Sequence, residues 1–163
     1  MTDASLRGDC PRCIGLCCVA LAFDRGPLFA VDKAGGEQCR NLCAHGGCGI
    51  HEELAERGFA GCANYDCRGA GQLTTELFAG LSWRDGAAVA RQMFAVFSKL
   101  SEVQTMRALL GQHIAAEMED VLAPRNGWTL ERAMTLELGA LRRQVRAALS
   151  GRMEAGRRMR SAL

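Results

Sequence analysis

Residues 10–18 read CPRCIGLCC, so four cysteines stand in a C-x2-C-x3-C-C run. The chain has 163 residues and nine cysteines, and residues 68–163 contain none of them. The uneven distribution predicts a thiol-rich first part of the chain and a second part that is stabilised in another way. The five cysteines after the run are Cys39, Cys43, Cys48, Cys62 and Cys67.

Three interpretations of the cysteines compete, namely disulfides, buried inert thiols and metal ligands. Residues 1–9 contain no apolar segment of the kind that directs export, and an odd cysteine count fits a disulfide framework poorly. Buried cysteines pack like small hydrophobic residues, which accounts for scattered cysteines but not for a tight knuckle beside proline and glycine. We therefore expect metal or cluster binding by reduced thiols in a cytoplasmic protein.

The length allows one ordinary hydrophobic core, or one core and a small metal-binding module. The formal net charge is +2, which implies no strong attraction to polyanions such as nucleic acid. No apolar run approaches the roughly 20 residues that span a bilayer, so we expect no membrane association. We predict four segments: a flexible leader over 1–9, a cysteine-rich metal-binding module over 10–71, a helical region over 72–151 and a basic tail over 152–163.

The predicted module has a composition that does not suit a hydrophobic core. Residues 10–71 contain eleven of the nineteen glycines and few long apolar patterns. Such a segment buries too little apolar surface to offset its ordering entropy, and metal bonds, worth roughly 10–16 kcal/mol for a structural zinc, are the usual substitute. Within it, we expect a short strand over 28–31 and a short helix over 50–57 that ends at Gly58.

A long amphipathic helix is predicted from Gly86 onward, because apolar residues recur there mostly at three- and four-residue steps. Ser82 or Asp85 could cap its start. The helix should end before Pro124, and it could break near Gly111. We interpret its methionines and aromatic residues as core rather than as a cofactor site. The apolar positions are Val89, Met93, Val96, Phe97, Leu100, Val103, Leu110, Ile114, Met118 and Val121.

A second long helix is predicted after a turn at 125–128, with Thr129 as its N-cap. A shorter helix is expected over 74–81. Two long helices joined by a short turn should pack antiparallel. The predicted fold class is therefore mainly α, with a small irregular cysteine-rich metal-binding module packed on an antiparallel helical hairpin or bundle. The helical face could bind a protein partner.

The C-terminal segment is basic, and Glu154 is its one acidic residue from Arg142 onward. Cations at a helix C-terminus complement the helix dipole. We favour this solvated helix end over a nucleic-acid interface, which no motif supports. The arginines are Arg142, Arg143, Arg146, Arg152, Arg157, Arg158 and Arg160.

Thiolates are soft ligands, which favour zinc, copper(I) and iron–sulfur clusters over magnesium or calcium. The knuckle at Cys10 and Cys13 lets two sulfurs reach one ion, while backbone N–H groups of the turn can stabilise thiolate charge. Side chains of adjacent residues point in different directions, so Cys17 and Cys18 should not complete one tetrahedral site together. Either they serve two centres or one of them is not a ligand.

Eight thiolates would fill two four-cysteine sites and leave one cysteine over. We predict zinc in more than one copy, with a structural, storage or sensing role; the alternative is an iron–sulfur cluster with a redox or enzymatic role. His45 and His51 lie among the cysteines, and we interpret them as surface or supporting residues. No catalytic signature is present.

Eight of the nine cysteines resemble, in order, the motif of the CxxCxxxCC cysteine-cluster family, which is described as zinc- or iron-chelating. The resemblance implies that the metal ligands are Cys10, Cys13, Cys17, Cys18, Cys39, Cys48, Cys62 and Cys67. Tyr65 matches the aromatic residue between the last two cysteines, whereas Cys43 is additional and His51 replaces a tyrosine. The resemblance covers residues 10–67 and implies metal chelation. The whole chain is also similar to the N-terminal region of some bacterial pentapeptide-repeat proteins, although the repeats themselves are absent here.

Overall fold

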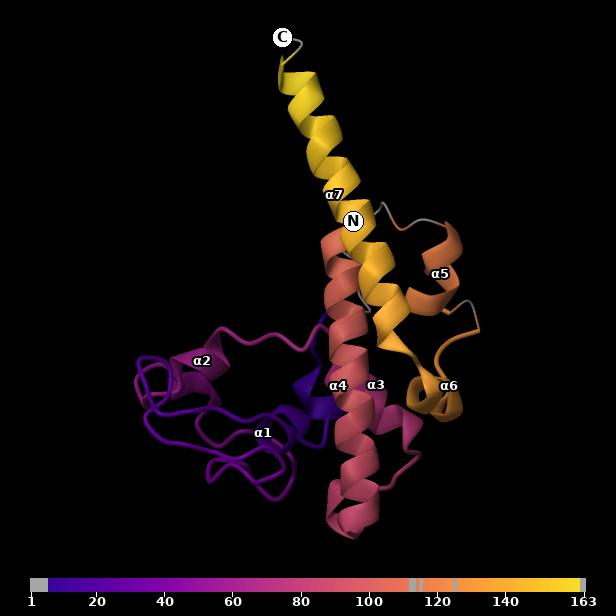
Figure 1. The fold of residues 1–163 in the computed structure, drawn as a ribbon. Helices are drawn as coiled ribbons and strands as arrows, with labels where there is room; N and C mark the ends of the chain where they lie inside the picture. Colours follow the sequence, from indigo (N-terminus) through magenta and orange to yellow (C-terminus); the bar gives the residue numbers. More distant parts are fainter. Residues whose placement is uncertain (1–5, 112–113, 115, 125, 162–163) are drawn as a thin grey trace.

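The computed structural model describes residues 6–111, 114, 116–124 and 126–161. Its regular structure is helical, which confirms the predicted mainly α fold class (Figure 1). Over these residues no β-strand forms, and extended pairing is limited to isolated bridges. The 3-10 helices are η2 (Cys10–Arg12), η3 (His51–Glu53) and η4 (Trp83–Asp85); the α-helices are α1 (Leu16–Ala20), α2 (Ala60–Ala63), α3 (Ala70–Leu77), α4 (Ala87–Leu110), α5 (Ala116–Leu122), α6 (Leu130–Thr135) and α7 (Leu138–Ser161).

The cysteine-rich segment between α1 and α3 is mostly loop (Figure 1). In place of the expected strand over 28–31, Gly26 and Phe29 pair across a tight turn, and the Gly26 N–H donates to the Phe29 carbonyl at 2.8 Å. The expected helix over 50–57 is reduced to η3, which buries no residue. Gly58 follows at a φ of 80°. With so little apolar surface to bury, these residues do not sustain longer regular elements.

The long helix α4 forms over the first part of the predicted apolar stripe, whereas Met118 and Val121 of that stripe lie in the separate helix α5. The helices α1, α3, α5, α6 and α7 pack against α4. The helix α4 ends at Gly111, where φ is 59°, so the predicted break is the end of the helix. Ser82 caps the preceding η4 rather than α4, in a reciprocal capping box with Asp85. The predicted helix over 74–81 corresponds to α3, which begins and ends four residues earlier.

The second predicted long helix is divided into α6 and α7. Thr129 caps α6 as predicted, because its Oγ1 accepts a hydrogen bond from the Arg132 N–H at 3.2 Å. The backbone then becomes extended at Leu136, where ψ is 124°, before α7 begins. Of the predicted turn over 125–128, residue 125 lies outside the described residues.

α7 lies parallel to α4, whereas the sequence predicted an antiparallel pair. Arg142 Nη2 donates to Glu102 Oε2 at 2.7 Å, and further along both helices Arg152 Nη1 donates to the Leu110 carbonyl at 3.2 Å. The short helices α5 and α6 explain this arrangement. They carry the chain back along α4 to the level of Lys99 before α7 starts (Figure 1).

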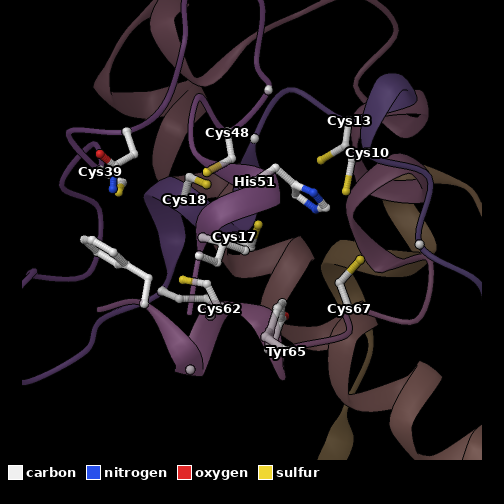
Figure 2. A pocket seen from close by; sticks show the side chains of 18 of the residues that line it. Cys10, Cys13, Cys17, Cys18, Cys39, Cys48, His51, Cys62, Tyr65 and Cys67 are labelled. Atoms are coloured by element: carbon white, nitrogen blue, oxygen red, sulfur yellow. The ribbon is translucent and has the colours of Figure 1, made fainter. Parts of the chain in front are cut away.

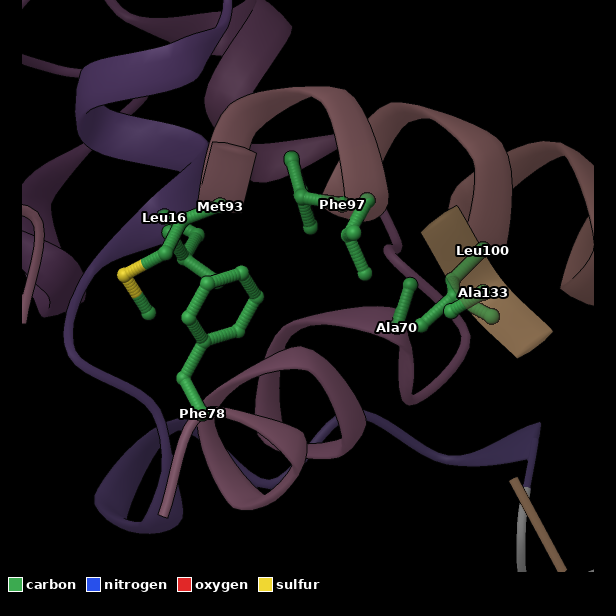
Figure 3. Close-up of a cluster of buried hydrophobic side chains, with 8 residues drawn as sticks. Leu16, Ala70, Phe78, Met93, Phe97, Leu100 and Ala133 are labelled. Carbon is green, nitrogen blue, oxygen red and sulfur yellow. The ribbon is translucent and has the colours of Figure 1, made fainter. Parts of the chain in front are cut away.

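One hydrophobic core joins the cysteine-rich segment to the helices (Figure 3). Cys13, Cys17 and Cys67 pack against this core, so it supports part of the thiol-rich region directly. The boundary after residue 71 between the two predicted segments therefore passes through shared packing. The buried members are Leu16, Ala70, Phe78, Met93, Val96, Phe97, Leu100 and Ala133.

A second core lies at the other end of α4, between α4, α5 and α7, and contains no cysteine among its described members. No helix in the described ranges combines the length and the apolar character that crossing a membrane requires. The buried members of this core are Val103, Met106, Leu110, Met118, Leu122, Leu141 and Val145.

Candidate metal centre

The cysteine-rich loops enclose a cavity of about 490 Å³ (Figure 2). All eight predicted ligand cysteines line it, although they come from four separate stretches of the chain. Cys43 is not among the described residues that line the cavity. The lining cysteines are Cys10, Cys13, Cys17, Cys18, Cys39, Cys48, Cys62 and Cys67.

A tight turn positions the first pair of thiols. Pro11 occupies the start of η2, where its missing N–H is no loss, and the Cys13 N–H donates to the Cys10 carbonyl at 3.1 Å. Gly15 then takes a φ of 77°, in the left-handed region that favours glycine, and leads into α1. The knuckle predicted from the C-x2-C spacing is therefore formed by local backbone geometry.

Cys13 and Cys67 meet at α3, against a residue that has no side chain. A Cβ on Gly71 would lie 2.8 Å from Cys13 Sγ and 3.7 Å from Cys67 Sγ. The neighbouring Gln72 fixes the chain that precedes the knuckle. Its side-chain Oε1 accepts a hydrogen bond from the Asp9 N–H at 3.1 Å, and its Nε2 donates one to the Arg7 carbonyl at 2.7 Å. The close approach of both sulfurs to α3 thus depends on glycine at position 71.

Two groups of thiols are visible across the cavity (Figure 2). Cys10, Cys13 and Cys67 lie on one side with the His51 ring, Cys17 lies near the middle, and the other four cysteines lie toward the opposite side. We call the first three, with Cys17, the Cys10 group. We call the remaining four the Cys39 group, whose members are Cys18, Cys39, Cys48 and Cys62.

Backbone contacts bring the Cys39 group together. The Cys39 N–H donates to the Cys18 carbonyl at 2.9 Å, and Cys48 pairs with Leu42 in an isolated bridge. Cys39 is buried at 8% exposure, in a small cluster with Val19 and Leu42. These loop residues thus approach the middle of α1, where Cys18 lies.

Within the Cys10 group, Cys17 lies nearest the middle of the cavity, between its other three members and the Cys39 group (Figure 2). A side-chain hydrogen bond with Cys18, and then burial, raise the pKa of the Cys17 thiol well above its ordinary value. The sequence argument had these adjacent side chains pointing apart. In the structure they remain close enough to interact, because both belong to a short helix whose thiol-bearing side faces the cavity.

The thiols experience two opposing influences on their acidity. Burial raises the pKa of Cys10, Cys13 and Cys48, and it raises the pKa of Cys62 to about 11. Backbone N–H groups act in the other direction: those of Leu16 and Gly15 lower the pKa of Cys13, and that of Ile50 lowers the pKa of Cys48. Such donors stabilise a thiolate, which is the form that binds metal.

A buried lysine stands behind the Cys39 group. Lys33 is 6% exposed, and its ammonium donates to the carbonyls of Val19, Ala34 and Glu37 at 3.1, 3.0 and 2.8 Å. Burial lowers its pKa, while the neighbouring charge of Cys39 opposes this change. Because all three ammonium donors have carbonyl partners, Lys33 links the end of α1 to the loop at residues 34–37. The ammonium also places a positive charge near the thiols of the Cys39 group.

The donor set fits soft metal ions, since the cavity combines eight sulfurs with N–H groups that stabilise thiolates. Among the described residues, no three Cys, His, Asp or Glu side chains are arranged to hold an ion as they stand. Coordination would therefore require the thiols to turn inward. Of the two histidines, His51 lines the cavity, whereas the His45 ring lies against Gly47.

Two residues of the site were not found from the sequence. Gly71 did carry a signal, because a glycine inside a helix costs about 1 kcal/mol relative to alanine and so usually has a packing reason. No feature of the sequence predicted the role of Lys33, because that role depends on backbone carbonyls that only the folded loop brings together.

Comparisons with known proteins identify one curated relative. Over 114 residues the chain is 41% identical to "Uncharacterized protein YybG" of Bacillus subtilis (strain 168). The match covers 69% of this chain and 41% of that relative, so the chain spans about two-fifths of the length of the curated relative it matches. No family profile matches the chain, and no solved structure matches it.

Proposed function

We propose that this protein binds more than one soft metal ion, zinc before others, through its eight cavity-lining cysteines. The observation that supports the proposal most strongly is which cysteines line the cavity. The eight cysteines that match the family motif line one cavity, whereas the ninth, Cys43, is not among its described lining residues. Inert cysteines packed for their apolar character have no reason to separate in this way.

The proposed arrangement is two neighbouring four-cysteine centres. Structural zinc takes four ligands in nearly every case, so eight thiolates exceed what one ion uses. The Cys10 group would hold one ion and the Cys39 group another, with Cys17 and Cys18 at the border between them. Rotation about χ1 moves a sulfur by a few ångströms without changing the backbone, which is the inward turn that coordination needs.

An iron–sulfur cluster is the second candidate, with a redox role. The cavity of about 490 Å³ is lined by eight thiols and has room for a multi-atom cluster as well as for single ions. Clusters and zinc both use thiolate ligands, so the same cysteines serve either proposal.

The proposal also covers the cellular environment of the protein and the role of the bound metal. All nine cysteines are free thiols, which favours a reducing, cytoplasmic environment in which the metal has a structural, storage or sensing role. The resemblance to the cysteine-cluster family, and to the N-terminal region of pentapeptide-repeat proteins, supports chelation. A protein partner would bind through the helical face. No reaction is proposed.

Anaerobic purification followed by elemental analysis and an absorption spectrum tests the proposal. We expect a colourless protein with about two zinc ions per chain. A brown protein with iron and acid-labile sulfide would select the second candidate. Protein purified and reconstituted without retaining zinc, iron or copper would refute metal binding altogether.

A further inference from the structure

Lys33 is a buried cation, and no ion pair within the described ranges includes it. Its side chain is 6% exposed, and its ammonium donates to three backbone carbonyls. The nearby Glu37 is exposed, and its carboxylate accepts a hydrogen bond from the Ala34 N–H at 3.1 Å. Carbonyls satisfy the donors of an ammonium but do not neutralise its charge, and a buried charge without a counter-charge is costly.

Hydrogen bonding alone does not explain why a charged residue stands here. The Val19 carbonyl also accepts from the Gly36 N–H at 2.9 Å, and the Ala34 carbonyl also accepts from the Glu37 N–H at 3.2 Å. Two of the three acceptors of Lys33 therefore have a backbone donor as well. A neutral residue at this position would leave at most one carbonyl without a donor and would bury no charge.

Backbone contacts hold the ammonium beside the thiol cavity. Its Val19 partner directly follows Cys18 in α1, and the Cys39 N–H donates to the Cys18 carbonyl at 2.9 Å. Cys39 and Val19 are buried in the same small cluster. The Phe23 ring, which lines the cavity, has its centroid 5.7 Å from the Lys33 nitrogen. Lys33 itself is not among the described lining residues, so its charge lies behind the cavity wall.

A metal–thiolate centre would supply the missing counter-charge. Four thiolates around one zinc ion carry two negative charges more than the ion neutralises. Burial lowers the pKa of Lys33, and the neighbouring charges that oppose this effect are those of Cys39, Glu37, Cys18 and Cys17. Three of these four groups are cysteines that line the cavity.

We propose that Lys33 is the internal counter-ion of the metal–thiolate centre, and that its charge raises the affinity of the cavity for thiolate-bound metal. This inference rests on the proposed function, and it concerns a residue that acts through the ligands rather than as one of them. The coupling is reciprocal, so bound metal favours the charged ammonium as strongly as the ammonium favours bound metal. A lysine that only fastened the loop would show neither effect.

Zinc affinity of the full chain, measured by competition with a chromophoric chelator, tests the role of the charge. Lys33→Met keeps an unbranched side chain and removes the ammonium. We expect the affinity for at least one zinc equivalent to fall by about tenfold or more. Urea unfolding should show a larger loss of stability in the zinc-loaded variant than in the metal-free variant. Lys99→Met is the matched control and should change neither property, because the Lys99 ammonium bonds the Met134 carbonyl and does not line the cavity.

A second measurement needs no variant. Lys33 and Lys99 are the two lysines of the chain, so isotopic labelling of lysine gives two side-chain signals for NMR. The pKa of the Lys33 ammonium should rise when zinc is loaded, whereas that of Lys99 should stay constant. An unchanged Lys33 pKa, or equal zinc affinity of Lys33→Met and the unmodified chain, would overturn the inference and leave metal binding intact. A chain that never loads zinc would instead refute the proposed function.

Discussion

At the scale of single residues, the site depends as much on what Gly71 lacks as on what the cysteines supply. Two sulfurs from distant parts of the sequence approach α3 at the point where a side chain would begin. Cysteine has one short side-chain torsion, so Cys13 could avoid a side chain at position 71 only by changing its χ1 rotamer and so the position of its sulfur. The glycine is therefore a requirement of the thiol arrangement rather than of the helix.

Gly71→Ala should lower the number of zinc ions bound per chain by about one. The added Cβ would meet Cys13 Sγ at 2.8 Å, so the Cys10 group should lose a ligand. The helix itself should gain up to about 1 kcal/mol from the change, so a loss of zinc could not be attributed to helix propensity. Gly151→Ala in α7, where nothing lies within 4 Å, is the matched control. Equal zinc content in both variants would show that Cys13 is not a ligand.

The thiol pKa values predict opposite pH dependences with and without metal. In the metal-free protein, Cys62 keeps its proton until about pH 11, whereas an unfolded thiol releases its proton near pH 9.0. Between these values the unfolded chain binds fewer protons than the folded chain, so stability should fall as pH rises. In the loaded protein the thiolates bind no protons. The unfolded chain then binds more protons below about pH 9, and stability should rise with pH up to that point.

Urea unfolding of both forms between pH 6 and pH 11 measures these slopes. The expected result is a rising curve for the loaded protein below pH 9 and a falling curve for the metal-free protein above it. Identical slopes for the two forms would mean that the cysteines are not deprotonated by metal.

At the scale of helices and loops, capping governs the ends of the elements. The Thr129 cap starts α6, and α6 turns the chain so that α7 can follow α4 in parallel. Thr129→Ala should destabilise the protein by about 1 kcal/mol, because the first turn loses the acceptor for the Arg132 N–H. Thr105→Ala is a suitable control, since its hydroxyl donates to the Ser101 carbonyl within the exposed face of α4. Unfolding in urea should show a loss for the first variant only, and equal stabilities would contradict the role of the cap.

The sequence was most informative where structure is local. The apolar stripe predicted a long helix, of which α4 is the first part, and turn chemistry predicted the Cys10 knuckle, a possible break near Gly111 and the cap at Thr129. The division into α6 and α7 could not be predicted in this way, because no proline or glycine marks Leu136 as a break. The parallel course of α7 likewise follows from the return through α5 and α6, which only packing reveals.

The candidate site shows the same division between local and long-range information. The resemblance to the cysteine-cluster motif pointed to the eight cysteines that line the cavity, since their identity and order are visible in the sequence. It could not show that Cys67 and Cys13 meet against Gly71, nor that Lys33 lies behind Cys39. Those contacts join residues far apart in the chain, through loops without any periodic pattern.

At the scale of the whole molecule, the two hydrophobic cores differ in their relation to the metal. The first contains Leu16 and Ala70 and supports the cysteines directly, whereas the second lies between α4, α5 and α7. Trp83 adds a link to the first, because its Nε1–H donates to the Ile14 carbonyl within the knuckle at 3.1 Å. Loss of metal should therefore affect the first core and spare the second.

Chelation should remove amide-exchange protection from residues 10–71 and from the part of α4 that faces the first core. The second core should keep its protection, because its described members include no cysteine. Hydrogen exchange with mass spectrometry, before and after chelator treatment, resolves the two regions. Simultaneous loss of protection throughout the chain would show that both cores unfold as one cooperative unit.

The count of ions against protected thiols tests the central claim most directly. Native mass spectrometry of the anaerobically purified chain, combined with iodoacetamide labelling, gives both numbers from one preparation. We predict at least two metal ions per chain, with the eight cavity-lining cysteines protected and Cys43 alkylated. A single zinc ion, with four or more of those eight cysteines freely alkylated, would contradict the two-centre account and leave one simple four-cysteine site.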